Sequence, residues 1–143
     1  LVADSGFPHC IVRFSGIYGP GRARLLRMVR DGRIEPMQAT QWTNRIHADD
    51  CARVLAFLIR RWQAGNAPHH CYIASDPCPT QAGEVWQWLA DALGVADPLA
   101  ATDWQQRPPT GKRCSPQRLL TEGFAFLHPD FRSGYRALLT HDD

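Results

Sequence analysis

A glycine-rich segment directly after a short apolar run constrains this sequence more than any other feature. Residues 10–14 are CIVRF, a β-prone run in which polar and apolar side chains hardly alternate, as is typical of a parallel strand covered on both faces. Residues 15–21 are SGIYGPG, with three glycines and a proline, and predict a loop with close or left-handed turns. Such loops, at the carboxyl ends of parallel strands, are where α/β sheets bind ligands.

Helical and strand patterns alternate along the next part of the chain. Residues 22–31 predict an amphipathic helix with a basic outer face, and residues 33–47 predict a loop with a short irregular strand. Asp49 or Asp50 is expected to cap a further helix. The buried stripe of that helix is predicted to consist of Val54, Leu55, Leu58 and Ile59.

The second half of the chain continues the alternation. Residues 71–74 predict a strand, and Thr80 is expected to cap a helix that ends at Gly94. The buried side of this helix is predicted to hold Val85, Trp86, Leu89, Ala90 and Leu93. Residues 95–113 are rich in proline and polar side chains and predict a long surface loop. The closing unit is predicted as a helix at 116–122, a strand at 124–126 and a helix at about 130–139.

This alternation predicts an α/β fold whose sheet is incomplete. The chain of 143 residues is long enough for one compact domain, but only two strands are strongly indicated, and a two-stranded sheet is rarely stable alone. Residues 1–6 resemble the last turn of a helix ending on a glycine, and residue 1 is Leu. We therefore expect residues 1–143 to be a single unit of a longer protein, with the missing strands upstream.

Composition excludes several classes of function. Sixteen Lys and Arg against fourteen Asp and Glu leave a formal net charge of +2, with the two signs interspersed, so neither nucleic acid nor a membrane is expected as a partner. No apolar run approaches the roughly twenty residues needed to cross a bilayer, and no signal peptide opens the chain. Five scattered cysteines favour reduced thiols. These features predict a soluble, cytoplasmic protein.

Two other kinds of binding site have little support. A metal site is not expected, because the spacing within a group of nearby ligand-type residues fits no standard zinc pattern: His69, His70, Cys71, Asp76 and Cys78. Five tryptophans could stack on bases, but a helix core accounts for Trp86 and the net charge offers no attraction for phosphates.

Three blocks of sequence occur in a recognisable order. The first is residues 11–22, IVRFSGIYGPGR, and the second is residues 46–52, IHADDCA. The third begins at residue 112 with KRCS and continues through Leu119, a Gly-Phe pair at 123–124 and RSGY at 132–135. Together they resemble the extended short-chain dehydrogenase/reductase family, the NAD(P)-dependent epimerases and dehydratases of nucleotide sugars. The resemblance covers nearly the whole chain.

The resemblance implies that this chain is the C-terminal part of a Rossmann-type parallel sheet plus a small substrate-binding α/β lobe. The cofactor, NAD or NADP, would be held mainly by an N-terminal dinucleotide-binding half of the same protein. In the family, a glycine-rich phosphate loop and a Tyr-x-x-x-Lys pair precede the first block. Here no lysine stands four residues after Tyr18, Tyr72 or Tyr135. We therefore assign no catalytic residue and expect no hydride transfer from this chain alone.

The resemblance also implies site residues. The candidate cofactor-binding residues are Phe14, Ser15 and Tyr18. The candidate substrate-binding residues, for a small molecule, are Gly16, Arg22, Asn44, Arg45 and His47. Gly16 stands where these epimerases commonly have an asparagine, and Thr43 stands where they have an arginine whose bidentate fork reaches phosphate. These departures favour a carbonyl or hydroxyl compound other than a diphosphate sugar.

Simpler roles compete for the same residues. His47 is better explained as a buried structural histidine than as an acid or base, and Tyr18 is equally well explained as a residue that packs on the sheet edge. A second hypothesis, motivated by Gly16 and Thr43, is a non-catalytic NAD(P)-sensing or ligand-binding module of the same fold. A homodimer remains open as well, since an exposed sheet edge can self-associate. The fold expectation requires the strands around Ile11 and Tyr72 to lie parallel in one sheet.

Overall fold

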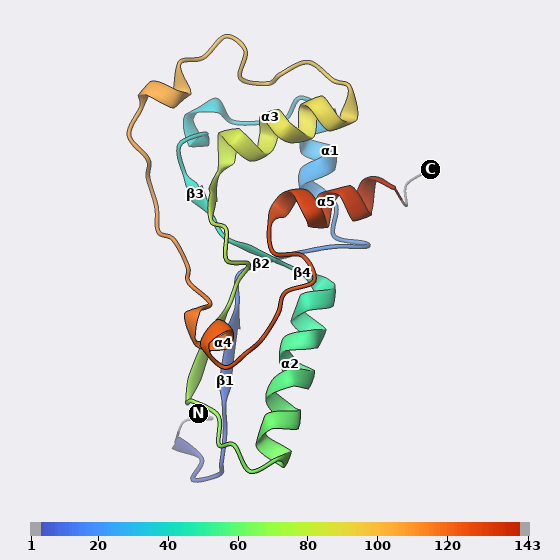
Figure 1. Cartoon of the computed structure of the whole chain (residues 1–143). Helices are drawn as coiled ribbons and strands as arrows, with labels where there is room; N and C mark the ends of the chain where they lie inside the picture. The colour runs from blue at the N-terminus through green and yellow to red at the C-terminus, as the bar shows by residue number, and fades with distance from the viewer. Residues whose placement is uncertain (1–3, 141–143) are drawn as a thin grey trace.

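The strand that opens the chain pairs in parallel with a strand sixty residues later. The computed structural model describes residues 4–140, and in it β1 (Ile11–Phe14) lies beside β5 (Cys71–Ala74), with Val12 opposite Tyr72. The two strands required to be parallel neighbours therefore are so, and the α/β expectation is confirmed. Figure 1 shows this pair in one half of the molecule, together with α2 and α4, and the helices α1, α3 and α5 in the other half.

A change of pairing partner follows β1. After Ser15 the chain continues as β2 (Gly16–Tyr18), which pairs in parallel with β4 (Arg45–His47) instead of β5. The Ser15 amide still donates to the carbonyl of Ala74 at 3.0 Å, whereas the Gly16 amide donates to the carbonyl of Asn44 at 3.1 Å. The predicted loop thus begins later than expected, because residues 16–18 find a strand partner that their glycine content does not reveal.

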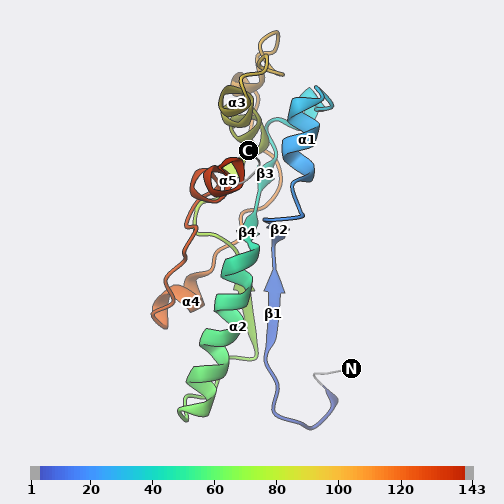
Figure 2. The ribbon, with the colours of Figure 1, turned by 90° about the vertical axis from the view of Figure 1, so that its right-hand side faces the viewer.

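The long helix α2 (Ala48–Gln63) lies along the β1–β5 pair (Figure 2). Val54 and Leu58 are buried as predicted, in a core shared with Ile46, Tyr72 and Phe124. Leu55 and Ile59 are 44% and 54% exposed, so this half of the predicted stripe is wrong for the described chain. The physical reason is that two strands cover only part of the helix surface. The apolar face of α2 is wider than the part they cover, so its margin stays exposed.

The start of α2 is capped differently from the expectation. The Nδ1 atom of His47 accepts the backbone N–H of Asp49 at 3.2 Å, so the cap is a histidine. Asp50 is fully buried, and its two carboxylate oxygens accept the backbone N–H groups of Leu127 and His128, each at 2.8 Å. The predicted Asp cap is therefore wrong, because Asp50 is recruited by a loop distant in sequence.

The other half of the molecule is built from three helices around a second core. They are α1 (Arg24–Arg30), α3 (Ala82–Leu93) and α5 (Phe131–Leu139). Their buried side chains include Leu26, Val29, Val85, Trp86, Leu89, Ala90, Phe131, Tyr135 and Leu138. The stripe predicted for α3 is confirmed, with Leu93 partly buried against this core. A short antiparallel pair, β3 (Trp42–Thr43) with β6 (Thr80–Gln81), leads into α3.

Several shorter elements differ from the expectation. Thr80 lies in β6 and Gln81 occupies the cap position of α3 without a side-chain hydrogen bond. No strand forms at residues 124–126; instead the Phe124 ring packs edge-on against Phe57 and Phe126. The remaining helical elements are α4 (Gln117–Thr121) and the 3₁₀ turns η2 (Pro36–Gln38) and η3 (Trp104–Gln106).

The long loop before α4 is anchored by a tryptophan. Trp104 is buried against Gly83 of α3, where an added Cβ would lie 2.7 Å from the indole ring. Only a glycine therefore admits the loop at this point of the helix.

Three remaining expectations concern the ends of the chain, the membrane and the cysteines. The helix end predicted at residues 1–6 falls partly on residues 1–3, which lie outside the described residues. Within residues 4–140, no helix is both long and apolar enough to span a bilayer. The five cysteines are unpaired.

Candidate functional site

A groove of about 420 Å³ runs between β2, β4 and the helices α1 and α3. Five of the eight candidate site residues line it: Gly16, Tyr18, Arg22, Asn44 and Arg45. Arg24 also lines the groove, and no acidic side chain is among its described lining residues. Three guanidinium groups without an opposing carboxylate on the wall make the groove attractive to anions.

Arg45 is the most unusual of these residues because it is only 6% exposed. It lies in β4, whose three residues are all buried, and its guanidinium carbon is 5.4 Å from the centroid of the Phe131 ring. Nη2 donates to the Thr43 hydroxyl, which in turn donates to the carbonyl of Thr80 at 2.6 Å. Nη1 has no hydrogen-bond partner among the described residues. A buried guanidinium normally has its donors paired, so this one has capacity to receive an acceptor.

Tyr18 and Tyr135 both line the groove as well. The Tyr18 side chain is 5% exposed, and its hydroxyl has no hydrogen-bond partner among the described residues. Burial raises the pKa of Tyr18 far above its ordinary value and raises the pKa of Tyr135 to about 12. Both phenols therefore stay protonated near neutral pH, and Tyr18 can act as a hydrogen-bond donor but not as a base.

Asp76 lies in the same buried region. It follows β5, and its backbone N–H donates to the carbonyl of Arg45 at 2.7 Å. Burial raises the pKa of its carboxyl to about 7, although the charge of Arg45 and the N–H of Cys78 act in the opposite direction. Oδ1 accepts the Cys78 N–H at 3.0 Å, whereas Oδ2 has no partner among the described residues. This buried region therefore holds two unpaired donor groups, Arg45 Nη1 and the Tyr18 hydroxyl, and one unpaired oxygen, Asp76 Oδ2.

The side chain of Asn44 holds a distant backbone segment in place, which its sequence position does not reveal. Its side-chain N–H donates to the carbonyl of Lys112 at 2.8 Å, and its side-chain oxygen accepts the backbone N–H of Cys114 at 2.6 Å. Both ends of the amide thus hold the segment that precedes α4. A direct contact from Asn44 to a substrate stays a prediction. It requires the side-chain amide to bind the substrate in addition to Lys112 or Cys114, or in place of one of them.

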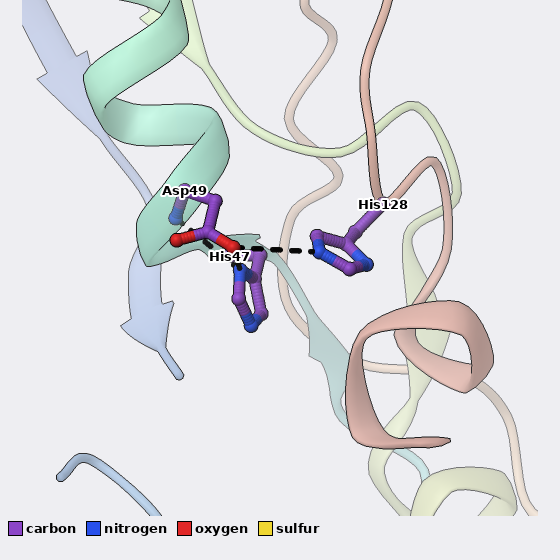
Figure 3. A group of neighbouring side chains, drawn as sticks. All are labelled: His47, Asp49 and His128. Atoms are coloured by element: carbon purple, nitrogen blue, oxygen red, sulfur yellow. Dashed lines mark hydrogen bonds and ion pairs between the residues drawn. The ribbon is translucent and has the colours of Figure 1, made fainter. Parts of the chain in front are cut away.

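His47 does not line this groove. It lies at a second cavity of about 270 Å³, lined also by residues 19–21, Ala23, Asp49 and two residues of α5. Its ring packs edge-on against Tyr18 and is 4.0 Å, centroid to centroid, from the ring of His128. Burial and the neighbouring His128 lower the pKa of His47. Figure 3 shows His47, Asp49 and His128 facing one another.

Phe14 and Ser15 lie outside both cavities. Phe14 ends β1 and packs against the core beneath α2, while the amide and hydroxyl of Ser15 both donate to the carbonyl of Ala74. The Gly16 amide donates to the carbonyl of Asn44. The cofactor contacts of Phe14 and Ser15 stay predictions that depend on further chain.

Sequence reasoning missed three residues of this region. Asp76 was considered only within a possible metal cluster, but no such cluster of three forms among its described members. His128 gave no signal, since it lies far along the chain from His47. Tyr135 was noted only as part of the RSGY block and as a tyrosine without a lysine four residues later, not as a residue of the groove wall.

Two solved structures are similar to this chain over almost its whole length. One, from Methylobacillus flagellatus, is provisionally described as an NAD-dependent epimerase/dehydratase; it is 38% identical over 99% of this chain and 50% of its own, with a TM-score of 0.86. The other, a conserved protein of unknown function from Silicibacter pomeroyi DSS, is 27% identical over 98% of this chain and 51% of its own, with a TM-score of 0.71.

The chain therefore spans about half the length of the solved structures that it matches. No family model and no curated protein matches it. The comparisons support the Rossmann-type α/β architecture and place this chain beside part of an epimerase/dehydratase-like structure.

Proposed function

We propose that this chain is the substrate-binding part of an NAD(P)-dependent epimerase/dehydratase or reductase. Its substrate would be a small carbonyl or hydroxyl compound that carries an anionic group. The observation that carries this proposal is the buried Arg45 guanidinium on the groove wall, with an unpaired Nη1 and no acidic side chain among the described lining residues. The likeness to part of the Methylobacillus flagellatus protein supports the class of activity.

In this proposal the groove residues bind and orient the substrate. Arg45, with Arg22 at the groove edge, would receive the anionic group, since a guanidinium offers donors in a fixed fork. The Tyr18 hydroxyl, protonated near neutral pH, would donate to a carbonyl or hydroxyl oxygen. The nicotinamide cofactor would supply or accept the hydride, and a dinucleotide-binding half of the same protein would hold it.

A second candidate function is a ligand-binding or NAD(P)-sensing module of the same fold. It is favoured by Gly16 and Thr43, which stand where nucleotide-sugar epimerases commonly have an asparagine and an arginine that contact the substrate. Both functions use the same groove, so ligand binding alone does not separate them. Turnover does, because only the enzyme converts the bound ligand into a product. A reductase does so with net oxidation or reduction of the nicotinamide, whereas an epimerase or dehydratase changes the ligand and returns the cofactor to its starting redox state.

The test uses the full-length protein that carries this chain. Calorimetry with glucose 1-phosphate, gluconate and glucose compares phosphorylated, carboxylated and neutral compounds. We expect at least one anionic compound to bind tighter than glucose by about tenfold or more, because hydrogen bonds to charged groups are worth about 1.5–3 kcal/mol. Arg22→Ala should reduce this preference. Arg30→Ala is the matched control, since Arg30 is an exposed arginine of α1 outside the groove.

Arg45→Met tests the buried guanidinium directly, with circular dichroism as the check that the variant folds. Equal binding of glucose and of the anionic compounds would contradict the proposed substrate class. An anion preference that survives both Arg22→Ala and Arg45→Met would place the binding site elsewhere.

A further inference from the structure

A cluster of metal-ligating side chains lies outside the groove. His47 comes from the end of β4, Asp49 from the first turn of α2, and His128 from the loop before α5. One ligand atom of each residue lies within 4.8 Å of those of the other two. We propose that His47, Asp49 and His128 form a binding site for a divalent transition-metal ion of the Zn²⁺ type.

The distances within the cluster are close to those of a metal site. Oδ2 of Asp49 is 3.5 Å from Nδ1 of His47 and 3.8 Å from Nε2 of His128. Ligand atoms that share a tetrahedral Zn²⁺ at 2.0–2.1 Å lie about 3.4 Å from one another. The two separations that involve Asp49 are thus within about 0.4 Å of this value, the two histidine ligand atoms lie within 4.8 Å of each other, and the three side chains come from separate elements and point toward one another (Figure 3).

The chemistry of the three ligands selects the class of ion. Two imidazoles and one carboxylate suit zinc and neighbouring first-row metals, whereas Mg²⁺ and Ca²⁺ prefer oxygen ligands. Three protein ligands leave at least one coordination position for water. His47 and Asp49 also line the 270 Å³ cavity, so this position has space beside it.

The backbone around the cluster is held in place by a second carboxylate. Asp50 accepts the N–H groups of Leu127 and His128 and thereby fixes the loop that carries the second imidazole. Asp49 by contrast is 59% exposed, and the described contacts of its carboxylate are with the two histidines. Fixed neighbours that orient metal ligands are a regular feature of protein metal sites.

Two features of the site lower its affinity for a metal ion. Nδ1 of His47 accepts the Asp49 N–H, and a bound ion would replace that hydrogen bond. The site is also at the positive end of the α2 dipole, which disfavours a cation. The negative charges of Asp49 and Asp50 offset the helix dipole and also compensate the positive charge of the bound ion.

The experiment is a metal titration of the full-length protein after treatment with a chelator. Co²⁺ is the spectroscopic probe, with Zn²⁺ as the competitor. We expect visible d–d bands typical of nitrogen and oxygen ligands, loss of those bands on adding Zn²⁺, and a rise in the melting temperature with Zn²⁺. Asp49→Asn and His128→Ala should each weaken Zn²⁺ binding by about tenfold or more.

His70→Ala is the matched control. His70 is exposed and forms a pair with His9, their ring centroids 5.9 Å apart, but no group of three ligands forms there among the described residues. This variant should bind Zn²⁺ as the unmodified protein does. Circular dichroism in the presence of the chelator verifies that each variant is folded.

Three results would overturn the proposal. They are unchanged Zn²⁺ affinity in both Asp49→Asn and His128→Ala, an equal loss in His70→Ala, and thiolate charge-transfer bands in the Co²⁺ spectrum, which would place the ion at the cysteines.

Discussion

The aromatic rings of Tyr18 and Tyr135 are stacked, with centroids 4.6 Å apart and an interplanar angle of 29°. Tyr18 ends β2 and Tyr135 lies in α5, so this contact joins the β2–β4 strand pair to the last helix at the wall of the groove. The contact depends on Gly134, over which the Tyr18 phenol lies. The groove wall is therefore set by the fit between a strand and a helix more than a hundred residues apart.

We predict that Gly134→Ala destabilises the protein. In most helices this substitution stabilises by about 0.5–1 kcal/mol. Here the added Cβ would fall 2.7 Å from Cζ and 2.8 Å from Cε2 of Tyr18. The clash should lower the free energy of unfolding by about 1–3 kcal/mol, measured by urea denaturation.

The double variant Tyr18→Ala/Gly134→Ala is the control for this prediction. Without the phenol, the alanine at position 134 has no clash and should become neutral or stabilising relative to Tyr18→Ala alone. An equal loss in both backgrounds would mean that the contact with Tyr18 is not the cause.

The stability should depend on pH through Asp76. Burial raises the pKa of its carboxyl from 3.8 to about 7 in the folded protein. Between these values the folded state holds a proton that the unfolded state has released, so stability falls as the pH rises through this window. This contribution changes by at most about 1.4 kcal/mol per pH unit.

Asp76→Asn removes this dependence, because an amide stays neutral. Urea denaturation at several pH values from about 4 to 8 should show the variant gaining stability relative to the unmodified protein as the pH rises. Taking this difference also removes the opposite contribution of His47, whose lowered pKa costs stability at acid pH. A constant difference across the range would contradict a raised pKa at Asp76.

Asp50 should be required to hold the loop that carries His128 in its folded conformation. Asp50→Asn replaces one accepting oxygen with an N–H donor that faces a backbone N–H, in a fully buried position. We expect a loss of about 2 kcal/mol or more in the free energy of unfolding, and faster hydrogen exchange at the Leu127 and His128 amides. Asp49→Asn, at an exposed position of the same helix turn, should cost less than about 1 kcal/mol.

Asn44 should act on stability through residues 112–114. Asn44→Ala removes two hydrogen bonds and should cost about 1–2 kcal/mol, with faster hydrogen exchange at the Cys114 amide. Asn66→Ala, in an exposed turn, serves as the control. Unchanged stability together with weaker ligand binding would instead make Asn44 a substrate contact.

Much of the architecture was predictable because its signals are local. The apolar run at residues 10–14 and the stripe of α3 each depend on neighbours within a few positions, and both appear in the structure. The predicted strand at 124–126 does not form, since its two phenylalanines pack against α2 and each other without a strand partner. A β-prone composition thus did not suffice, because Phe124 of this segment packs against a helix and the segment pairs with no strand of the described sheets.

The candidate site was predictable only as a region. The glycine-rich segment and the residues before α2 indicated where a ligand would bind, and the groove is lined by both. Which side chains have free hydrogen-bonding capacity was not predictable. Asn44 looked free and is occupied, whereas Arg45 is buried with an unpaired Nη1.

The sequence by itself determined the alternation of strands and helices and the parallel pairing of β1 with β5, and it indicated the region where we propose that a ligand binds, since periodicity and turn residues act over short distances. Only the tertiary structure decided which polar groups are buried and what they face. Asp50, Asp76 and Arg45 resemble surface residues in the sequence, yet each is buried by segments far along the chain. Burial changes the free energy of a charge far more than local sequence does, so the chemistry of this site is a property of the fold.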